Sequence, residues 1–115
     1  MPSDRYRIFD LRDLLLDSAQ VARSLLDDCQ RTTPARVRAL CPVAEKFIAV
    51  LEDATPLEAA RDLRFDEITS ADPDALLIAL RQRWQGGYEP VGCISDTDAE
   101  GLPRCFLLTQ KTAEN

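Results

Sequence analysis

Four cysteines and twenty acidic residues offer the most chemistry in this 115-residue sequence, and no histidine accompanies them. Histidine is the commonest general base, metal ligand and activator of a nucleophile, so the usual serine and cysteine hydrolase triads are excluded. No glycine-rich phosphate-binding motif occurs, because Gly86-Gly87 precedes residues typical of a strand. We therefore expect no catalytic residue and no cofactor. A histidine-free enzyme that uses cysteine or carboxylate chemistry is the alternative.

The run from Asp96 to Gly101 is the most specific local pattern. Oxygen-bearing side chains at Asp96, Asp98 and Glu100, followed by Gly101, match the first half of a calcium-binding loop. The twelfth position, where such a loop needs a bidentate glutamate, is Leu107. Aspartate and glycine are also the residues that make an ordinary polar turn. The prediction is therefore no metal site, with these three acidic residues as weak candidates.

Cys93 and Cys105 stand at equal distances from the middle of that loop, so a simple register would place them opposite each other on paired strands. A redox pair needs an accessible, stabilised thiolate, and Arg104 is the one adjacent cation. We predict that both are small buried apolar residues and keep them as weak redox candidates. No C-x-x-C spacing supports a zinc site.

The formal net charge of −6 disfavours direct binding to nucleic acid or to an anionic membrane. No apolar run is long enough to span a membrane, and residues 1–10 lack a signal-peptide pattern, so a cytoplasmic protein is expected. Acidic side chains could instead stand in for phosphates, which would make the protein a nucleic-acid mimic that inhibits a DNA- or RNA-binding enzyme. The candidates for that role are Asp13, Asp17, Asp27, Asp28, Glu52 and Asp53.

Helix-start signals are frequent, because threonine or aspartate before proline supplies a cap and a first-turn residue. Such pairs are Thr33-Pro34, Thr55-Pro56 and Asp72-Pro73. Together with apolar periodicity they predict helices at 11–31, 34–40, 42–53, 56–63 and 73–85, a strand at 5–9, and a hairpin of strands 88–95 and 104–110. The predicted fold is α+β: one domain, residues 1–115, in which the N-terminal strand joins the hairpin in one small antiparallel sheet. We find no internal repeat.

The helix at 73–85 is the clearest element, since its apolar stripe ends at Gly86-Gly87. Trp84 continues that stripe and is expected to pack between helix and sheet. The sequence Gly87-Tyr88-Glu89 before a hairpin resembles the ending of small bacterial domains of uncharacterised role. That resemblance covers about thirty residues and implies no activity.

The hairpin has apolar residues on both faces, so it must be covered twice, by the preceding helices or by another molecule. One face carries Val91, Cys93 and Leu107. We therefore predict a non-enzymatic protein–protein interaction module, a small acidic adaptor, inhibitor or regulator. Its partner would be another protein or a second copy bound through the hairpin sheet. The predicted partner-binding residues are Ile78, Tyr88, Val91, Ile94, Phe106 and Leu108.

Overall fold

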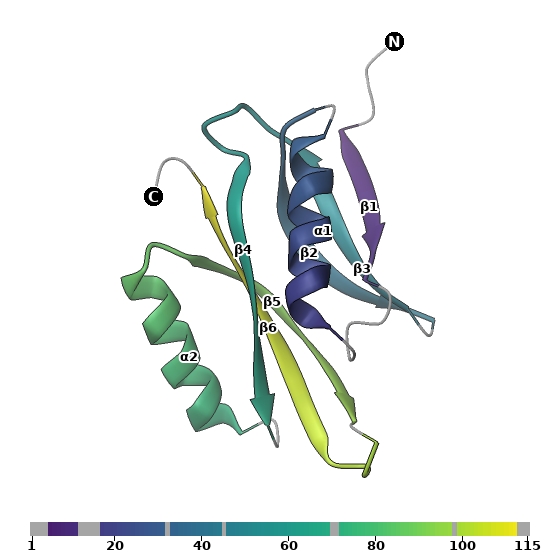
Figure 1. Cartoon of the computed structure of the whole chain (residues 1–115), viewed down its shortest axis with the longest axis vertical. Coiled ribbons are helices and arrows are strands. Elements are labelled where there is room, and N and C mark those ends of the chain that lie inside the picture. The colour runs from purple at the N-terminus through teal and green to yellow at the C-terminus, as the bar shows by residue number, and fades with distance from the viewer. Residues whose placement is uncertain are drawn as a thin grey trace.

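The computed structural model describes residues 5–11, 17–31, 33–44, 46–69, 72–97 and 99–112 (Figure 1). In chain order these residues form β1 (Tyr6–Asp10), α1 (Ser18–Gln30), β2 (Ala35–Val43), β3 (Lys46–Asp53), β4 (Ala60–Thr69), α2 (Pro73–Gln85), β5 (Glu89–Thr97) and β6 (Pro103–Thr112). Sheet A has the strand order β1-β3-β2, and sheet B has the order β4-β6-β5. Two helices and two antiparallel sheets in these residues replace the predicted series of helices and single sheet, so the predicted fold is wrong.

The segments 34–40 and 42–53, predicted to be helices, are strands β2 and β3. The apolar run 47–51 caused the error, because a continuous run fits either a helix or a strand covered on both faces. In the structure this run is part of strand β3. Ile48 and Val50 share one face of the sheet with Ile8, whereas Ala49 and Leu51 lie on the other face. The β-branched side chains of Ile48 and Val50 favour this pleated conformation.

The prolines at the starts of the predicted helices 42–53 and 56–63 do not begin helices. Pro42 lies near the end of β2, an edge strand of sheet A, where a missing N–H is tolerated. The carbonyl of Thr55 does accept hydrogen bonds from the N–H groups of Glu58 and Ala59, both at 3.0 Å. That turn is not continued, because the chain enters β4 at Ala60. The predicted helix at 56–63 is therefore wrong.

Strand pairing also differs from the prediction. β1 pairs with β3 in sheet A, and the hairpin strand β6 pairs with β4 on its other side. β4 takes the place predicted for the N-terminal strand, and it includes residues 64–69, for which the sequence predicts no helix or strand. Buried Leu63 and half-buried Phe65 alternate in β4 with Arg64 and Asp66, which is the period of a strand.

Both helices begin at an aspartate cap. The carboxylate of Asp72 accepts from the Asp74 N–H at 3.0 Å, and α2 covers residues 73–85, the range that the pattern predicts. The carboxylate of Asp17 accepts from the Gln20 N–H at 3.0 Å, and α1 begins at Ser18. Asp10 belongs to β1, and residues 12–16 of the predicted helix 11–31 lie outside the described residues. Neither of the two helices in the described ranges is long and apolar enough to cross a membrane.

The two halves of the chain share one topology, which the sequence did not reveal. Each half runs strand, helix, strand, strand, with its last strand in the centre of its sheet. α1 and α2 both contain 13 residues. The second strand of each half has a register irregularity, between Val37 and Ala39 in β2 and between Pro90 and Gly92 in β5. The structure therefore contains two successive βαββ units.

The units stack so that α1 lies against both sheets. On one side α1 covers the face of sheet A that carries Phe9 and Leu51, and on the other it contacts β4 of sheet B. Sheet B turns Leu63, Phe106 and Leu108 toward this common core. α2 lies on the opposite face of sheet B, so β4 runs between the two helices in Figure 1.

The sheets meet at the edge strands β2 and β5. Here the side-chain amide of Gln110 accepts from the Val37 N–H at 3.0 Å and donates to the Val37 carbonyl at 2.8 Å. Arg36 of β2 forms an ion pair with Glu89 of β5 at 2.6 Å. One buried amide and one half-buried ion pair thus connect the two units.

Candidate functional site

An ion pair connects α2 to sheet B. The guanidinium of Arg83 donates two hydrogen bonds to the Asp66 carboxylate on β4, at 2.7 and 2.6 Å. The hydrogen bond to Asp66 raises the pKa of Arg83 above its usual value. Leu76 and Leu80 are half-buried, and none of the thirteen residues of α2 is buried. A helix held in this way keeps most of its surface accessible.

The accessible side of α2 carries three large apolar side chains beside the exposed charges of Asp74 and Arg81. Leu77 is 45% exposed, Ile78 55% and Trp84 73%, and we call these three residues the outer side of α2. Beside them lies a shallow cavity of about 370 Å³, lined by Leu80, Arg81, Trp84, Gln85 and Pro90. Trp84 therefore does not pack between helix and sheet as predicted. Exposed large apolar side chains gathered on one element are typical of an interaction surface.

A polar network lies where β4 faces the end of α2. The Tyr88 hydroxyl donates a short hydrogen bond to the Asp62 carboxylate, and Arg64 lies 3.3 Å from the same carboxylate. Burial raises the pKa of Asp62, but the Tyr88 hydrogen bond and the Arg64 charge outweigh it, and the pKa is lowered overall. A carboxyl group in this state stays ionised near neutral pH, so it holds the network together and does not serve as a general acid.

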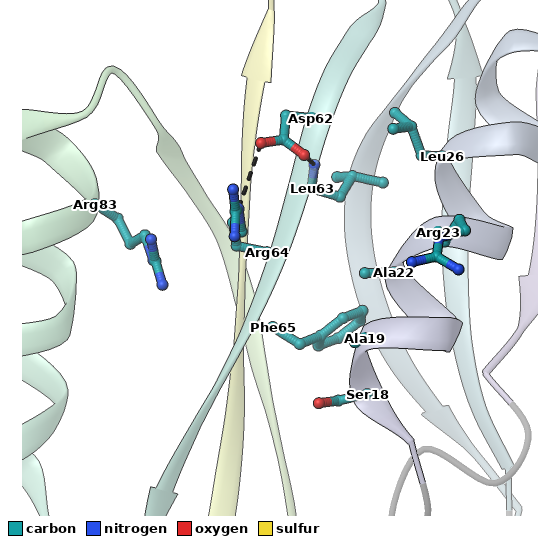
Figure 2. Close-up of a pocket in the computed structure, with 10 residues that line it drawn as sticks. All are labelled: Ser18, Ala19, Ala22, Arg23, Leu26, Asp62, Leu63, Arg64, Phe65 and Arg83. Atoms are coloured by element: carbon teal, nitrogen blue, oxygen red, sulfur yellow. Dashed lines mark hydrogen bonds and ion pairs between the residues drawn. The ribbon is translucent and has the colours of Figure 1, made fainter.

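A groove of about 360 Å³ separates α1 from β4 (Figure 2). Leu63 and Phe65 point from β4 toward α1 in Figure 2, whereas Arg64 points to the side of α2. Arg23 of α1 lines the groove and forms no ion pair with any residue of the described ranges. The groove therefore marks the line along which the helix of the first unit packs on the sheet of the second.

Three of the predicted partner-binding residues are inside the protein. Ile94, Phe106 and Leu108 are buried in the core that sheet B shares with α1. Val91 is partly buried against the same core. Ile78 is exposed on α2, and half-buried Tyr88 belongs to the polar network. The structure thus brings Ile78 together with Leu77 and Trp84, and not with the hairpin residues.

The candidate calcium loop lies partly outside the described residues, because Asp98 is not among them. The Asp96 carboxylate accepts a hydrogen bond from the Thr97 N–H at 2.6 Å, and Glu100 lies in an exposed turn. Over the ranges that the structure describes, no three His, Cys, Asp or Glu side chains are grouped to hold a metal ion.

The two hairpin cysteines share a face but are not opposite each other. Cys93 pairs with Leu107 and Cys105 with Ser95, so the cysteines are diagonal neighbours. Cys93 is exposed and Cys105 is buried, and burial raises the pKa of both thiols. This is the opposite of the stabilised thiolate that redox chemistry needs.

Several acidic residues considered as phosphate mimics are engaged within the chain. Asp28 lies 3.1 Å from Arg31, Glu52 lies 2.8 Å from Arg5, and Asp17 caps α1. The remaining positions are Asp13, outside the described residues, exposed Asp27, and Asp53, which lies 3.5 Å from Arg7.

Asp62, Asp66 and Gln110 are the residues that sequence reasoning missed. Their partners lie 26, 17 and 73 residues away in the chain, and no local pattern reports such distances. The alternation of Asp62, Arg64 and Asp66 is the one local signal, because a period of two predicts a strand with a polar face.

No protein-family model matches the chain, and comparison with the curated proteins and with the solved structures gives no significant match.

Proposed function

We propose that this chain is a non-enzymatic protein-binding module, a small acidic adaptor, inhibitor or regulator of the cytoplasm, and that the outer side of α2 is its docking surface. The observation that carries the proposal is a helix without a buried residue that exposes 73% of Trp84 beside Leu77 and Ile78. A few residues supply most of the binding energy in protein interfaces, and tryptophan is enriched among them.

The surroundings of α2 support binding more than catalysis. The ionisable groups between α2 and β4, namely Asp62, Arg64 and Arg83, are paired with one another, with Tyr88 or with Asp66. Arginine does not exchange protons near neutral pH, and the lowered pKa of Asp62 keeps that carboxylate ionised. These groups therefore fix the position of α2 relative to β4 and leave its apolar side free to bind.

The test is affinity capture from the native host with three tagged chains. They are the unchanged protein, Trp84→Asp, and the control Leu57→Asp, which changes an exposed leucine outside α2. We expect a protein that the unchanged chain and the control retain and that Trp84→Asp loses. Equal retention by all three chains would place the binding surface elsewhere.

Ionic strength provides a second readout. An apolar interface should keep its retention between low and moderate salt, because hydrophobic burial is not screened. Binding by an acidic mimic of nucleic acid would instead weaken steeply as salt is raised.

A further inference from the structure

The chain already contains an example of what covers a helix of this kind. Counted from their capping aspartates, α1 and α2 can be superimposed residue by residue, with an offset of 55 that follows from Asp17 and Asp72. Four, five, eight and twelve residues after the cap, α1 has the buried residues Val21, Ala22, Leu25 and Cys29. At the same positions α2 has Leu76, Leu77, Leu80 and Trp84. Both helices thus carry one apolar stripe at the same place.

The two stripes differ in what lies over them. Ala22 and its neighbour Arg23 line the groove against β4, so this side of α1 faces the sheet of the following unit. The corresponding residues of α2 are Leu77 and Ile78, which are exposed, and the groove residues Ala19 and Leu26 correspond to exposed Asp74 and Arg81. α2 has a sheet beneath it, as α1 has, but no described element lies over its outer side.

At one superposed position each helix forms an ion pair with the first strand of its own unit, although the strand registers match Arg7 with Arg64 and not with Asp66. Asp28 of α1 lies 3.8 Å from Arg7 on β1, and its carbonyl also accepts from Arg7 at 3.1 Å. The same position of α2 is Arg83, which pairs with Asp66 on β4. Each helix is thus tied at one equivalent position to the first strand of its own unit, with the signs of the charges reversed.

The face that packs on α1 is also defined. Sheet B meets α1 with the face that is turned away from its own helix α2, the face of Leu63, Phe65 and Phe106. The equivalent face of sheet A is the one turned away from α1, and we call it the back face of sheet A. Its apolar residues, from the strand registers, are Tyr6, Ile8, Ala39, Cys41, Val43, Ile48 and Val50, and the same registers place Asp10, Lys46 and Glu52 toward its ends.

The back face of sheet A is apolar and open. Ile8 is 70% exposed, Tyr6 54% and Val43 53%, and no described helix packs on this face. Charged residues at its border are paired, Arg5 with Glu52 at 2.8 Å and Lys46 with Asp10 at 3.9 Å. Both surfaces therefore combine apolar side chains with a few charged ones, because exposed Asp74 and Arg81 lie beside Leu77 and Trp84 on α2.

We propose that the outer side of α2 docks on the back face of sheet A in a second copy of this chain, which repeats between copies the stacking of the two units within one copy. The inference rests on the proposed function, because it names the partner of the same surface. α2 and β1 lie at opposite sides of the molecule in Figure 1, so one copy cannot cover its own surfaces. A symmetric pair of α2 helices is less complete, because it leaves the back face of sheet A open.

Such an interface is head-to-tail. Two different surfaces meet, so an open assembly of any length has one free surface of each kind, one at each end. Growth therefore continues unless a ring closes. The expected behaviour is a mass that rises with concentration beyond that of a dimer.

The experiment is light scattering coupled to size-exclusion chromatography of the full chain over a wide concentration range. The unchanged protein should exceed the monomer mass of 12.9 kDa increasingly as its concentration rises. Trp84→Asp and Ile8→Asp should each remain monomeric, because each removes one of the two surfaces, and the control Leu57→Asp should associate like the unchanged protein. Both changed residues are exposed, so folding is retained, and circular dichroism checks it.

Mixing decides the geometry. Trp84→Asp keeps its back face of sheet A and Ile8→Asp keeps its α2, so an equimolar mixture should form a 1:1 dimer of about twice the monomer mass and nothing larger. Self-association of Ile8→Asp alone would overturn the head-to-tail arrangement. A chain that stays monomeric at all concentrations would overturn the inference, and if it still captures a host protein in a Trp84-dependent way, the proposed function stands without it.

Discussion

Replacing Gln110 with alanine is the perturbation whose effect the structure defines best. Gln110 lies in the central strand β6, is 1% exposed, and inserts its amide against Val37, which is 2% exposed. The amide accepts from the Val37 N–H at 3.0 Å and donates to the Val37 carbonyl at 2.8 Å. Because β2 has a register irregularity at this point, the side chain provides the hydrogen bonds that a neighbouring strand would provide.

The magnitude follows from the two backbone groups left without partners. Each buried N–H or carbonyl that loses its hydrogen bond costs about 1–3 kcal/mol, so Gln110→Ala should lower the free energy of unfolding by about 2–6 kcal/mol. For a domain of this length that corresponds to a fall in Tm of roughly 10–20 °C. Urea unfolding followed by circular dichroism measures the change in free energy, and calorimetry measures the change in Tm.

Thr109 is the matched control, because it precedes Gln110 in β6 and is also fully buried. The hydroxyl of Thr109 has no hydrogen-bond partner in the described part of the chain, so Thr109→Val should leave stability unchanged or raise it by about 1 kcal/mol. A loss below about 1 kcal/mol for Gln110→Ala, or equal losses for the two variants, would refute the role assigned to the amide.

Gln110→Glu adds a test by pH. A carboxylate at this position still accepts from Val37 N–H, but it cannot donate to the carbonyl and it lies close to Glu89. Burial and the Glu89 charge would raise the pKa of that carboxyl above its usual value of about 4.3. A group whose pKa is raised by folding is stabilising when protonated, so the stability of Gln110→Glu relative to the unchanged protein should recover as pH falls, whereas Gln110→Ala shows no recovery.

Three further predictions follow from exposure and pKa. Trp84→Ala should lower the free energy of unfolding by less than about 1 kcal/mol, measured by urea unfolding, because the side chain is largely exposed. Alkylation followed by mass spectrometry should modify exposed Cys93 first and Cys29 only on unfolding, because burial raises the pKa of Cys29 to about 12. Tyr88→Phe should raise the pKa of Asp62, measured by carbon NMR titration, because it removes a hydrogen bond that lowers it. The ionised form of Asp62 stabilises the fold above its usual pKa of about 4, and this contribution to stability disappears as pH falls toward the lowered pKa. An Asp62 titration that is unchanged in Tyr88→Phe would contradict the hydrogen bond between the two residues.

The segment from α2 to β6 was predicted well because its signals are local. The Asp72 cap, the apolar stripe and the Gly86-Gly87 end all fall within α2, and the loop between β5 and β6 joins two adjacent strands. In the first half, similar signals had other causes. Thr55 caps one turn that β4 then interrupts, and Pro42 lies at a strand edge where its missing N–H costs little.

The repeat was invisible in the sequence because it conserves physical roles and not residue types. The tie between helix and first strand uses Asp28 with Arg7 in one unit and Arg83 with Asp66 in the other, so the charges are exchanged. The apolar stripe uses Cys29 where α2 has Trp84. A comparison by residue type finds nothing in common at these positions, whereas the strand pairing shows the equivalence directly.

The same comparison explains why Trp84 was misplaced. An apolar stripe tells us that one side of a helix is to be covered, but it does not say by which element or from which molecule. In α1 the stripe is covered from two sides, by sheet A and by the sheet of the next unit, and Cys29 is fully buried. In α2 one of those layers has no counterpart among the described residues, and Trp84 is exposed at the equivalent position. The exposed tryptophan thus stands where the repeat places a further sheet, which is the basis of the docking proposed above.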